Sequence, residues 1–152
     1  MKVLFDTNVV LDVLLAREPH AAVAVQLFAL VERGEMEGAV CATAITTIHY
    51  IAMRAVGPKV TQKHLRQLLT LFEVAPVTGE VLTSGLDLGF PDFEDAVVHE
   101  AARACGAAAI VTRNAKDFAK ASLPILSPVE LLAAVAAGRS RGEQPPLGPA
   151  IG

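Results

Sequence analysis

Two polar segments, far apart in this chain, carry side chains that can hold a divalent cation. One contains Asp6, which directly follows a short apolar run, and Asn8 two residues later. The other comprises residues 92–95 and 112–117, which supply carboxylates, an amide and two basic side chains. Oxygen ligands without thiolates or paired histidines select Mg²⁺ or Mn²⁺. Because a cation held in this way lowers the pKa of a bound water, these residues indicate hydrolysis of a phosphodiester.

The carboxylates of this set have alternative roles. Asp6 is a candidate metal ligand, although an aspartate just before a helix also serves as an N-cap, and the same holds for Asp92. Asp92 and Asp95 are three residues apart and share one face of a first helical turn. Crowded acidic residues repel one another unless some of them face a cation, and we expect Glu94 to face solvent. The candidate catalytic residues are Asp6, Asp92, Asp95, Asn114 and Asp117, and the candidate metal ligands are Asp6, Asp92, Asp95 and Asn114.

Residues 112–117 complete the candidate site. Asn114 is either an oxygen ligand or a helix cap, and Asp117 either joins the site or only braces its loop. Arg113 and Lys116 are candidate phosphate contacts, with ordinary surface charge as the alternative. Asn8 is expected to orient Asp6 or to donate to a phosphate oxygen. The candidate substrate-binding residues are Asn8, Thr112, Arg113 and Lys116.

Short apolar strands that alternate with helices are expected to position these residues. Strands are predicted at residues 2–5, 38–41, 72–77, 108–111 and 124–126, with Pro76 limiting the third of them to a sheet edge. Helices are predicted at residues 8–16, 19–33, 43–55, 62–71, 79–88, 93–105 and 128–137, with one helical turn at 115–119. The alternation predicts an α/β fold, a three-layer α/β/α sandwich with a short, mainly parallel central sheet. Parallel strands end at a common edge, where Asp6 and residues 112–117 are expected to meet.

Length and composition bound the class of protein. A chain of 152 residues is one domain, with residues 1–137 as the folded part and residues 138–152 as a flexible or disordered tail. The net charge of −3 excludes the broad basic surface of a nucleic-acid coat. Cys41 and Cys105 cannot build a disulfide framework. Neither a charged leader nor a membrane span is evident, so we expect a cytoplasmic protein with no membrane partner.

Three motifs give the chain a resemblance to a known family. They are FDTNVVLD at residues 5–12, DFEDA at residues 92–96 and IVTRNAKDF at residues 110–118. With these motifs in this order, the chain resembles the PIN-domain ribonucleases, which include the VapC-type toxins of bacterial toxin–antitoxin pairs. The resemblance covers about residues 2–135.

The resemblance implies a Mg²⁺- or Mn²⁺-dependent ribonuclease in which a metal-activated water hydrolyses RNA. The family's first aspartate matches Asp6, and its later acidic residue at a helix start matches Asp95, with Asp92 close by. Its final polar ligand matches Asn114, with Asp117 nearby. A homodimer is also implied and, for toxin members, a small antitoxin protein whose peptide enters the acidic groove.

One departure from the family pattern lowers the expected charge of the site. The family usually has an acidic residue on the helix after the second strand, and Thr47 stands near that position. The missing carboxylate disfavours catalysis with two metal ions and lowers the expected affinity for one. His49 lies close by, although a lone histidine on an apolar helix is more often a packing residue.

Two other classes of function stay open from the sequence. Dehalogenase-like phosphohydrolases also place an aspartate nucleophile, here Asp6, after the first strand, but the phosphatases among them carry a second aspartate where this chain has Asn8. A PIN-like module that binds RNA or a protein without cleaving RNA is the third class. The RNA target is not assigned, because Tyr50 and Phe118 are the candidates for base stacking and core packing is the more common fate of both.

Overall fold

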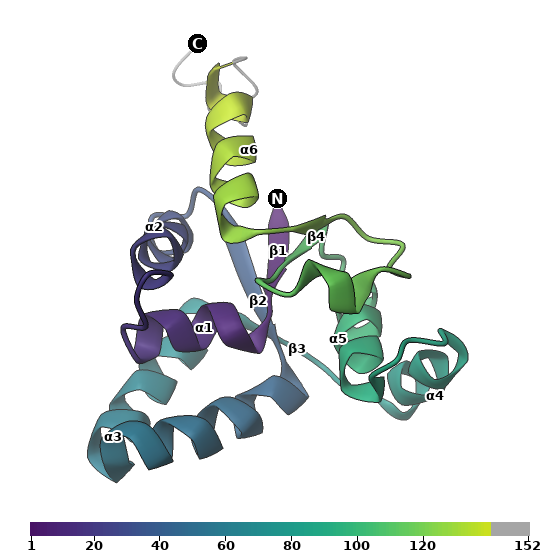
Figure 1. The fold of residues 1–152 in the computed structure, drawn as a ribbon, viewed down its shortest axis with the longest axis horizontal. Coiled ribbons are helices and arrows are strands. Elements are labelled where there is room, and N and C mark those ends of the chain that lie inside the picture. Colours follow the sequence, from purple (N-terminus) through teal and green to yellow (C-terminus); the bar gives the residue numbers. More distant parts are fainter. Residues whose placement is uncertain (141–152) are drawn as a thin grey trace, which may run out of the picture.

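The computed structural model describes residues 1–140, which form an α/β sandwich around a five-stranded parallel sheet. The strands are β1 (Lys2–Phe5), β2 (Glu37–Cys41), β3 (Glu73–Ala75), β4 (Ala109–Val111) and β5 (Ile125–Leu126). The helices are α1 (Thr7–Leu14), α2 (Ala21–Glu32), α3 (Ala42–Leu71), α4 (Gly79–Asp87), α5 (Phe93–Ala104), α6 (Pro128–Ser140) and the short 3-10 helix η1 (Ala115–Phe118). Figure 1 shows α1, α2 and α6 on one side of the sheet and α4 and α5 on the other. The predicted fold class is therefore confirmed.

The strand order β3-β2-β1-β4-β5 places β1 at the centre of the sheet, with a parallel neighbour on each side. Val3, Leu4 and Phe5 are fully buried because helices cover both faces of this strand. A continuous apolar run is what such a two-sided environment requires. β3 lies at one edge, as Pro76 predicts for its segment.

The helix bounds differ from the prediction by one or two residues at most ends and by more in α3 and α6. Residues 43–55 and 62–71 were predicted as separate helices, and α3 does consist of two helical segments that meet at the non-helical Gly57, although the second segment begins earlier than predicted. Gly57 makes the kink with a φ of 79°, which glycine adopts without strain, and Pro58 follows it. α6 continues past Ala137 to Ser140, and residues 141–152 of the predicted tail lie outside the described residues. None of the helices in the described part combines the length and apolar character needed to cross a membrane.

Aromatic rings fill the core between β1, α2 and the end of α3. The ring centroid of Phe5 lies 5.8 Å from that of Phe28 and 5.0 Å from that of Phe72, and both pairs meet edge to face. The Phe72 ring also lies against Gly38 of β2, where an added Cβ would come within 2.5 Å of it. A glycine at this position lets the ring pack directly on the sheet.

Candidate active site

The register of the sheet brings the two polar segments together at its carboxyl edge. Phe5 of β1 pairs with Val111 of β4, so Asp6 and Thr112 both follow directly after this pair. The backbone N–H of Asp6 continues the ladder by donating to the Val111 carbonyl at 3.0 Å. Residues more than 100 positions apart are thus held side by side by ordinary parallel pairing.

Neighbouring donors fix the carboxylate of Asp6. Its Oδ1 accepts from the N–H of Thr7 at 2.9 Å, and its Oδ2 accepts from the hydroxyl of Thr112 at 2.8 Å. The amide of Asn8 also donates to Oδ2, at 3.5 Å. Burial raises the pKa of Asp6, the hydrogen bonds from Thr112 and Thr7 lower it, and the charges of nearby acidic residues raise it again. The side chain is therefore oriented by hydrogen bonds, but no basic side chain of residues 1–140 pairs with it to balance its charge.

Asn8 and Thr112 connect the two segments. The side-chain amide of Asn8 donates to Thr112 Oγ1 at 3.3 Å, and its carbonyl accepts from the backbone N–H of Arg113 at 3.2 Å. Thr112 Oγ1 also accepts from the backbone N–H of Asn114 at 3.0 Å. The turn that follows β4 is consequently held against the start of α1 by side chains that also contact Asp6.

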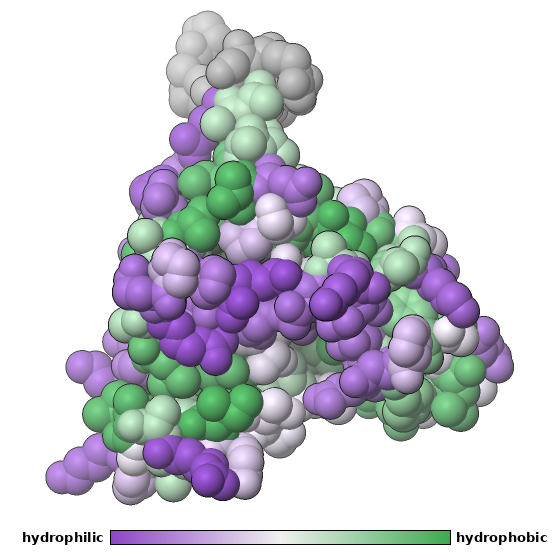
Figure 2. Space-filling view, viewed as in Figure 1, coloured by the Kyte–Doolittle hydropathy of each residue, from purple (hydrophilic) through white to green (hydrophobic). Residues whose placement is uncertain are grey.

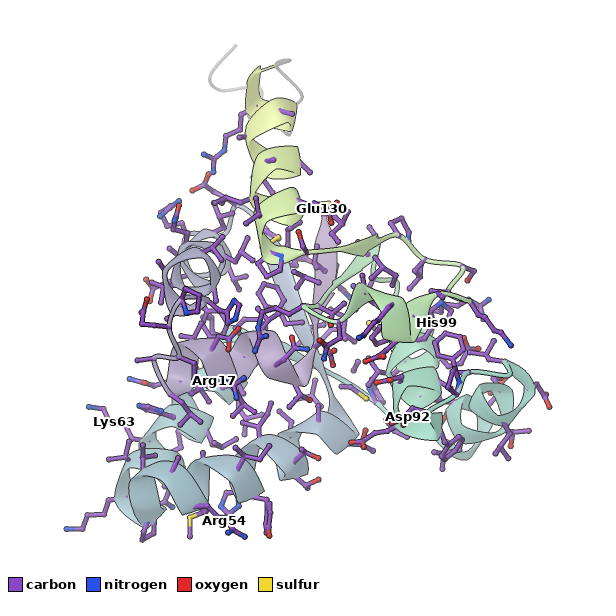
Figure 3. All side chains as sticks on the ribbon, viewed as in Figure 1. Arg17, Arg54, Lys63, Asp92, His99 and Glu130 are labelled. Carbon is purple, nitrogen blue, oxygen red and sulfur yellow. The ribbon has the colours of Figure 1, made fainter. Side chains whose placement is uncertain are left out.

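Asp95 approaches the same edge from the start of α5. Asp92 lies at the start of this helix (Figure 3) and caps it by accepting from the Glu94 N–H at 2.7 Å. Asp95, half-buried on the first turn, has no hydrogen-bond or ion-pair partner for its carboxylate within residues 1–140. Burial raises the pKa of Asp95 to about 7, and the charges of Asp92, Asp6, Asp117 and Glu94 add to the effect. Uncompensated negative charge therefore collects between α5 and the end of β1.

A second carboxylate of α1 is held in a different way. Asp12 is fully buried, and its Oδ2 accepts from Arg113 Nε at 2.6 Å. Its Oδ1 accepts from Arg113 Nη2 at 3.1 Å and from Arg17 Nε at 2.9 Å. Arg17 Nη2 also donates to the backbone carbonyl of Asn8 at 3.0 Å. We call Asp12, Arg17 and Arg113 the arginine clamp.

The remaining residues predicted for the site lie at its rim. Asn114, Lys116 and Asp117 are exposed, and the side chain of Asn114 does not cap η1. The charge of Asp117 nevertheless acts on Asp6 and Asp95, since it raises the pKa of both. These three side chains face solvent around the carboxyl edge.

The helix after the second strand contributes no carboxylate. Thr47 is half-buried in α3, and the whole helix contains neither Asp nor Glu. Tyr50 of the same helix is 61% exposed, so the expectation that it packs in the core was wrong. Phe118 is buried, as expected.

The donor set fits a hard cation that keeps much of its own water. The side chains at the edge offer carboxylate, hydroxyl and amide oxygens, which suit Mg²⁺ or Mn²⁺. Within residues 1–140, however, no three His, Cys, Asp or Glu side chains come together closely enough to hold a metal by themselves. Mg²⁺ needs only one or two protein carboxylates beside water and phosphate, so Asp6 and Asp95 meet that need.

Two stabilising groups near the site escaped prediction from the sequence. The arginine clamp leaves a weak signal, an aspartate five residues before an arginine, and nothing local points to Arg113 as its second partner. Buried His99 of α5 also connects the site-bearing segments: its Nδ1 pairs with Glu100 at 2.9 Å, and its Nε2 accepts from the Ser122 N–H at 3.1 Å. His99 thereby holds α5 against the segment that follows η1, and no sequence pattern marks it.

Comparison with protein families gives a match to the PIN domain over residues 2–116. No match was found among curated protein sequences. Solved structures from bacteria are similar in fold, at low sequence identity.

A toxin–antitoxin complex from Klebsiella pneumoniae has 22% identity and a TM-score of 0.64, covering 83% of this chain and 97% of that one. FitAcB from Neisseria gonorrhoeae has 17% identity and a TM-score of 0.67, with coverages of 84% and 98%. VapC20 of Mycobacterium tuberculosis, a toxin that cleaves the sarcin–ricin loop, has 16% identity and a TM-score of 0.57, with coverages of 71% and 86%. At these identities the likeness concerns the fold.

Proposed function

Because the chain belongs to the PIN domain family, we propose that it is a Mg²⁺- or Mn²⁺-dependent ribonuclease that cleaves RNA at the edge formed by Asp6 and Asp95. Nuclease activity is typical of this family, and one structural neighbour is described as a toxin that cleaves the sarcin–ricin loop. The observation that carries the proposal is the half-buried carboxylate of Asp95, which has no basic partner in the described part of the chain and is repelled by the charge of Asp6. Strongly perturbed carboxylates of this kind are enriched at functional sites.

The roles of the residues follow from their contacts. Thr7, Thr112 and Asn8 hold Asp6 in one orientation, so its carboxylate is ready to bind a cation without further ordering. Asp95 supplies the second carboxylate from the first turn of α5. Mg²⁺ or Mn²⁺ held by these two carboxylates would lower the pKa of a bound water and neutralise charge on the phosphate. Asp92, Asn114 and Asp117, which are exposed around the edge, would add oxygen atoms for the cation or for its waters.

Phosphate contacts are assigned to exposed Lys116 rather than to Arg113. The guanidinium of Arg113 faces buried Asp12 and makes two hydrogen bonds to it. Withdrawing it towards a phosphate would leave Asp12 with Arg17 alone, which is costly for a fully buried charge. In this proposal Arg113 holds the turn that contains Thr112, and it does not touch RNA.

A module that binds without cleaving is the second candidate, favoured by the lack of a carboxylate on α3 and of a three-residue metal cluster in residues 1–140. A phosphohydrolase with Asp6 as nucleophile receives less support. The phosphatases of that class carry a second aspartate two residues after the nucleophile, and this chain has Asn8 at that position.

Two partners belong to the proposal. The Klebsiella neighbour is a toxin–antitoxin complex, and a basic side chain of an antitoxin would be attracted to the negative charge around Asp6 and Asp95. A homodimer in the cytoplasm is proposed from the family resemblance. A protein encoded beside this chain that binds it and suppresses its activity would support the antitoxin.

Cleavage of a panel of RNAs tests the activity. The purified chain is expected to cut at least one RNA with Mg²⁺ or Mn²⁺ and none with EDTA. Asp6→Asn and Asp95→Asn are each expected to lose activity by about a hundredfold or more, because each removes a ligand charge. Exposed Asp87 of α4 offers a matched control, since Asp87→Asn should cleave like wild type. Cleavage of no RNA with any metal, or a trapped aspartyl-phosphate on Asp6, would reject the proposal.

A further inference from the structure

Positive charge is gathered on the two helical segments of α3, which meet at Gly57. α3 carries four of the chain's 13 Lys and Arg residues and none of its 16 Asp and Glu residues. The four cations are Arg54, Lys59, Lys63 and Arg66, and all are exposed. We call these four residues the basic face of α3. Arg54 and Lys63 both extend from α3 towards solvent in Figure 3, and Figure 2 shows hydrophilic side chains projecting at the same corner of the molecule.

The basic face lacks the carboxylate partners that most other cations of residues 1–140 have, and only Lys116 and Lys120 share this lack in the described part of the chain. Six other cations of residues 1–140 form ion pairs, namely Lys2, Arg17, Arg33, Arg103, Arg113 and Arg139. No residue of the basic face has an ion pair within the described part of the chain. Unpaired, exposed cations are free to bind an external anion, and such a cluster produces a local positive potential.

Helical spacing arranges these cations on the side opposite the core. In the second half of α3, Lys59, Lys63 and Arg66 follow the spacing i, i+4, i+7, which places them along one stripe. The buried residues Thr61, Leu65 and Leu68 repeat the same spacing on the opposite side.

An exposed aromatic ring lies beside the first cation. Tyr50 is 61% exposed, and the guanidinium of Arg54 lies 5.8 Å from its ring centroid. Arg54 Nη1 also donates to the Tyr50 hydroxyl at 3.1 Å, which fixes both side chains. Exposed aromatic rings flanked by arginine are stacking platforms for unpaired bases.

α3 begins where the candidate active site lies. Its first residue, Ala42, directly follows Cys41 at the carboxyl end of β2, which is the edge of the sheet that holds Asp6. Arg54 lies twelve residues further on, about 18 Å along the helix axis. α3 leads away from this edge (Figure 1). A strand of RNA that is cut at the edge and follows α3 would therefore meet Tyr50 and then the basic face.

We infer that α3 binds single-stranded RNA, with phosphates along its basic face and an unpaired base on Tyr50. The inference rests on the proposed ribonuclease function, and it names the surface that holds the substrate. The acidic edge repels RNA before a cation is bound, and Lys116 at its rim supplies a single positive charge, so further attraction must come from elsewhere on the molecule. The basic face supplies it.

Fluorescence anisotropy with a short, labelled single-stranded RNA in EDTA tests this surface without cleavage. The triple variant Lys59→Gln, Lys63→Gln, Arg66→Gln is expected to raise Kd by about tenfold or more and to lower the salt slope by about 2, since each phosphate contact contributes about 0.7. The triple variant Arg33→Gln, Lys120→Gln, Arg139→Gln removes the same charge elsewhere and is expected to change Kd by less than about threefold. Circular dichroism verifies that both variants fold.

Tyr50→Ala separates stacking from charge. It is expected to raise Kd by about fivefold or more and to leave the salt slope unchanged, because stacking on a ring releases no counterions. Equal losses in the two triple variants, or no RNA binding by wild type, would overturn the inference. So would an α3 variant that keeps its RNA affinity but loses self-association or binding of an acidic protein.

The cleavage assay distinguishes this failure from failure of the proposed function. RNA cleavage that is independent of α3 rejects the surface and leaves the ribonuclease intact. RNA binding that depends on α3 without cleavage under any metal rejects the ribonuclease and leaves the surface.

Discussion

Asp12 and Asp95 are carboxylates that the fold places in opposite surroundings. Asp12 is fully buried and accepts three hydrogen bonds from two guanidinium groups. Asp95 is half-buried, accepts none within residues 1–140 and lies among other negative charges, so its pKa is raised to about 7. The first arrangement balances the charge, and the second leaves it for something outside the chain to balance.

The contrast separates structural from functional charge within one small domain. The arginine clamp connects α1 to the turn after β4, and both of its arginines pair with Asp12. At the edge, repulsion between Asp6 and Asp95 lowers the stability of the folded chain. A protein retains such a destabilising arrangement where function depends on it. The free energy of unfolding should therefore respond to substitutions in opposite directions in the two regions.

Breaking the arginine clamp is expected to have the largest effect on stability. Asp12→Ala leaves Arg17 and Arg113 without their carboxylate partner and should lower the free energy of unfolding by about 3 kcal/mol. This is the lower end of the range for a broken buried pair, because both arginines reach solvent. The midpoint of thermal unfolding should fall by about 10 °C in EDTA. The exposed Asp87→Ala should stay within about 0.5 kcal/mol of wild type. An Asp12→Ala protein as stable as its control would contradict the clamp.

Removing one arm of the clamp is expected to cost less and to show what Arg113 does. Arg113→Gln should lower the free energy of unfolding by about 2 kcal/mol, since Asp12 keeps Arg17. Its effect on cleavage should appear in kcat, while the salt slope of RNA binding stays unchanged. Lys116→Gln should do the reverse, with wild-type stability and a salt slope lowered by about 0.7. A lower salt slope for Arg113→Gln would show that Arg113 contacts an RNA phosphate.

Neutralising the unbalanced carboxylate is expected to have the smallest effect, with the opposite sign. Asp95→Asn removes charge that Asp92 and Asp6 repel, so in EDTA it should raise the free energy of unfolding. Solvent screening limits the gain to less than about 1 kcal/mol, or about 2–4 °C in the unfolding midpoint. Asp87→Asn is the matched control and should leave the midpoint unchanged. Destabilisation by Asp95→Asn would mean that its charge is balanced in the native chain.

The meeting of the two polar segments was predictable from sequence because it depends on strand ends. Asp6 and Thr112 each follow a short apolar run, and parallel pairing of Phe5 with Val111 is enough to bring them together. Gly57-Pro58 was predicted to separate two helices, and the structure has two helical segments that meet at the non-helical Gly57. Local signals thus located both the strand ends and this break, but they missed that the second segment already begins beside Pro58 rather than at residue 62.

The fate of individual charged and aromatic side chains was less predictable. Arg113 lies in a polar segment, and only the fold shows that its guanidinium pairs with buried Asp12 of α1. Tyr50 is aromatic and was expected to pack in the core, but it lies on the side of α3 opposite buried Ile48 and is exposed. The absence of acidic residues in α3 was readable from the sequence, yet its importance depends on ion pairs that only the structure reveals.

Binding of Mn²⁺ measured by electron paramagnetic resonance tests the central claim, that Asp6 and Asp95 together hold a divalent cation. The wild-type chain is expected to bind Mn²⁺ and to release it to excess Mg²⁺. Asp6→Asn and Asp95→Asn should each weaken binding by about tenfold or more, because each removes a ligand charge, whereas Asp87→Asn should bind like wild type. Mn²⁺ binding that survives both substitutions, or that is absent from the wild-type chain, would contradict the account.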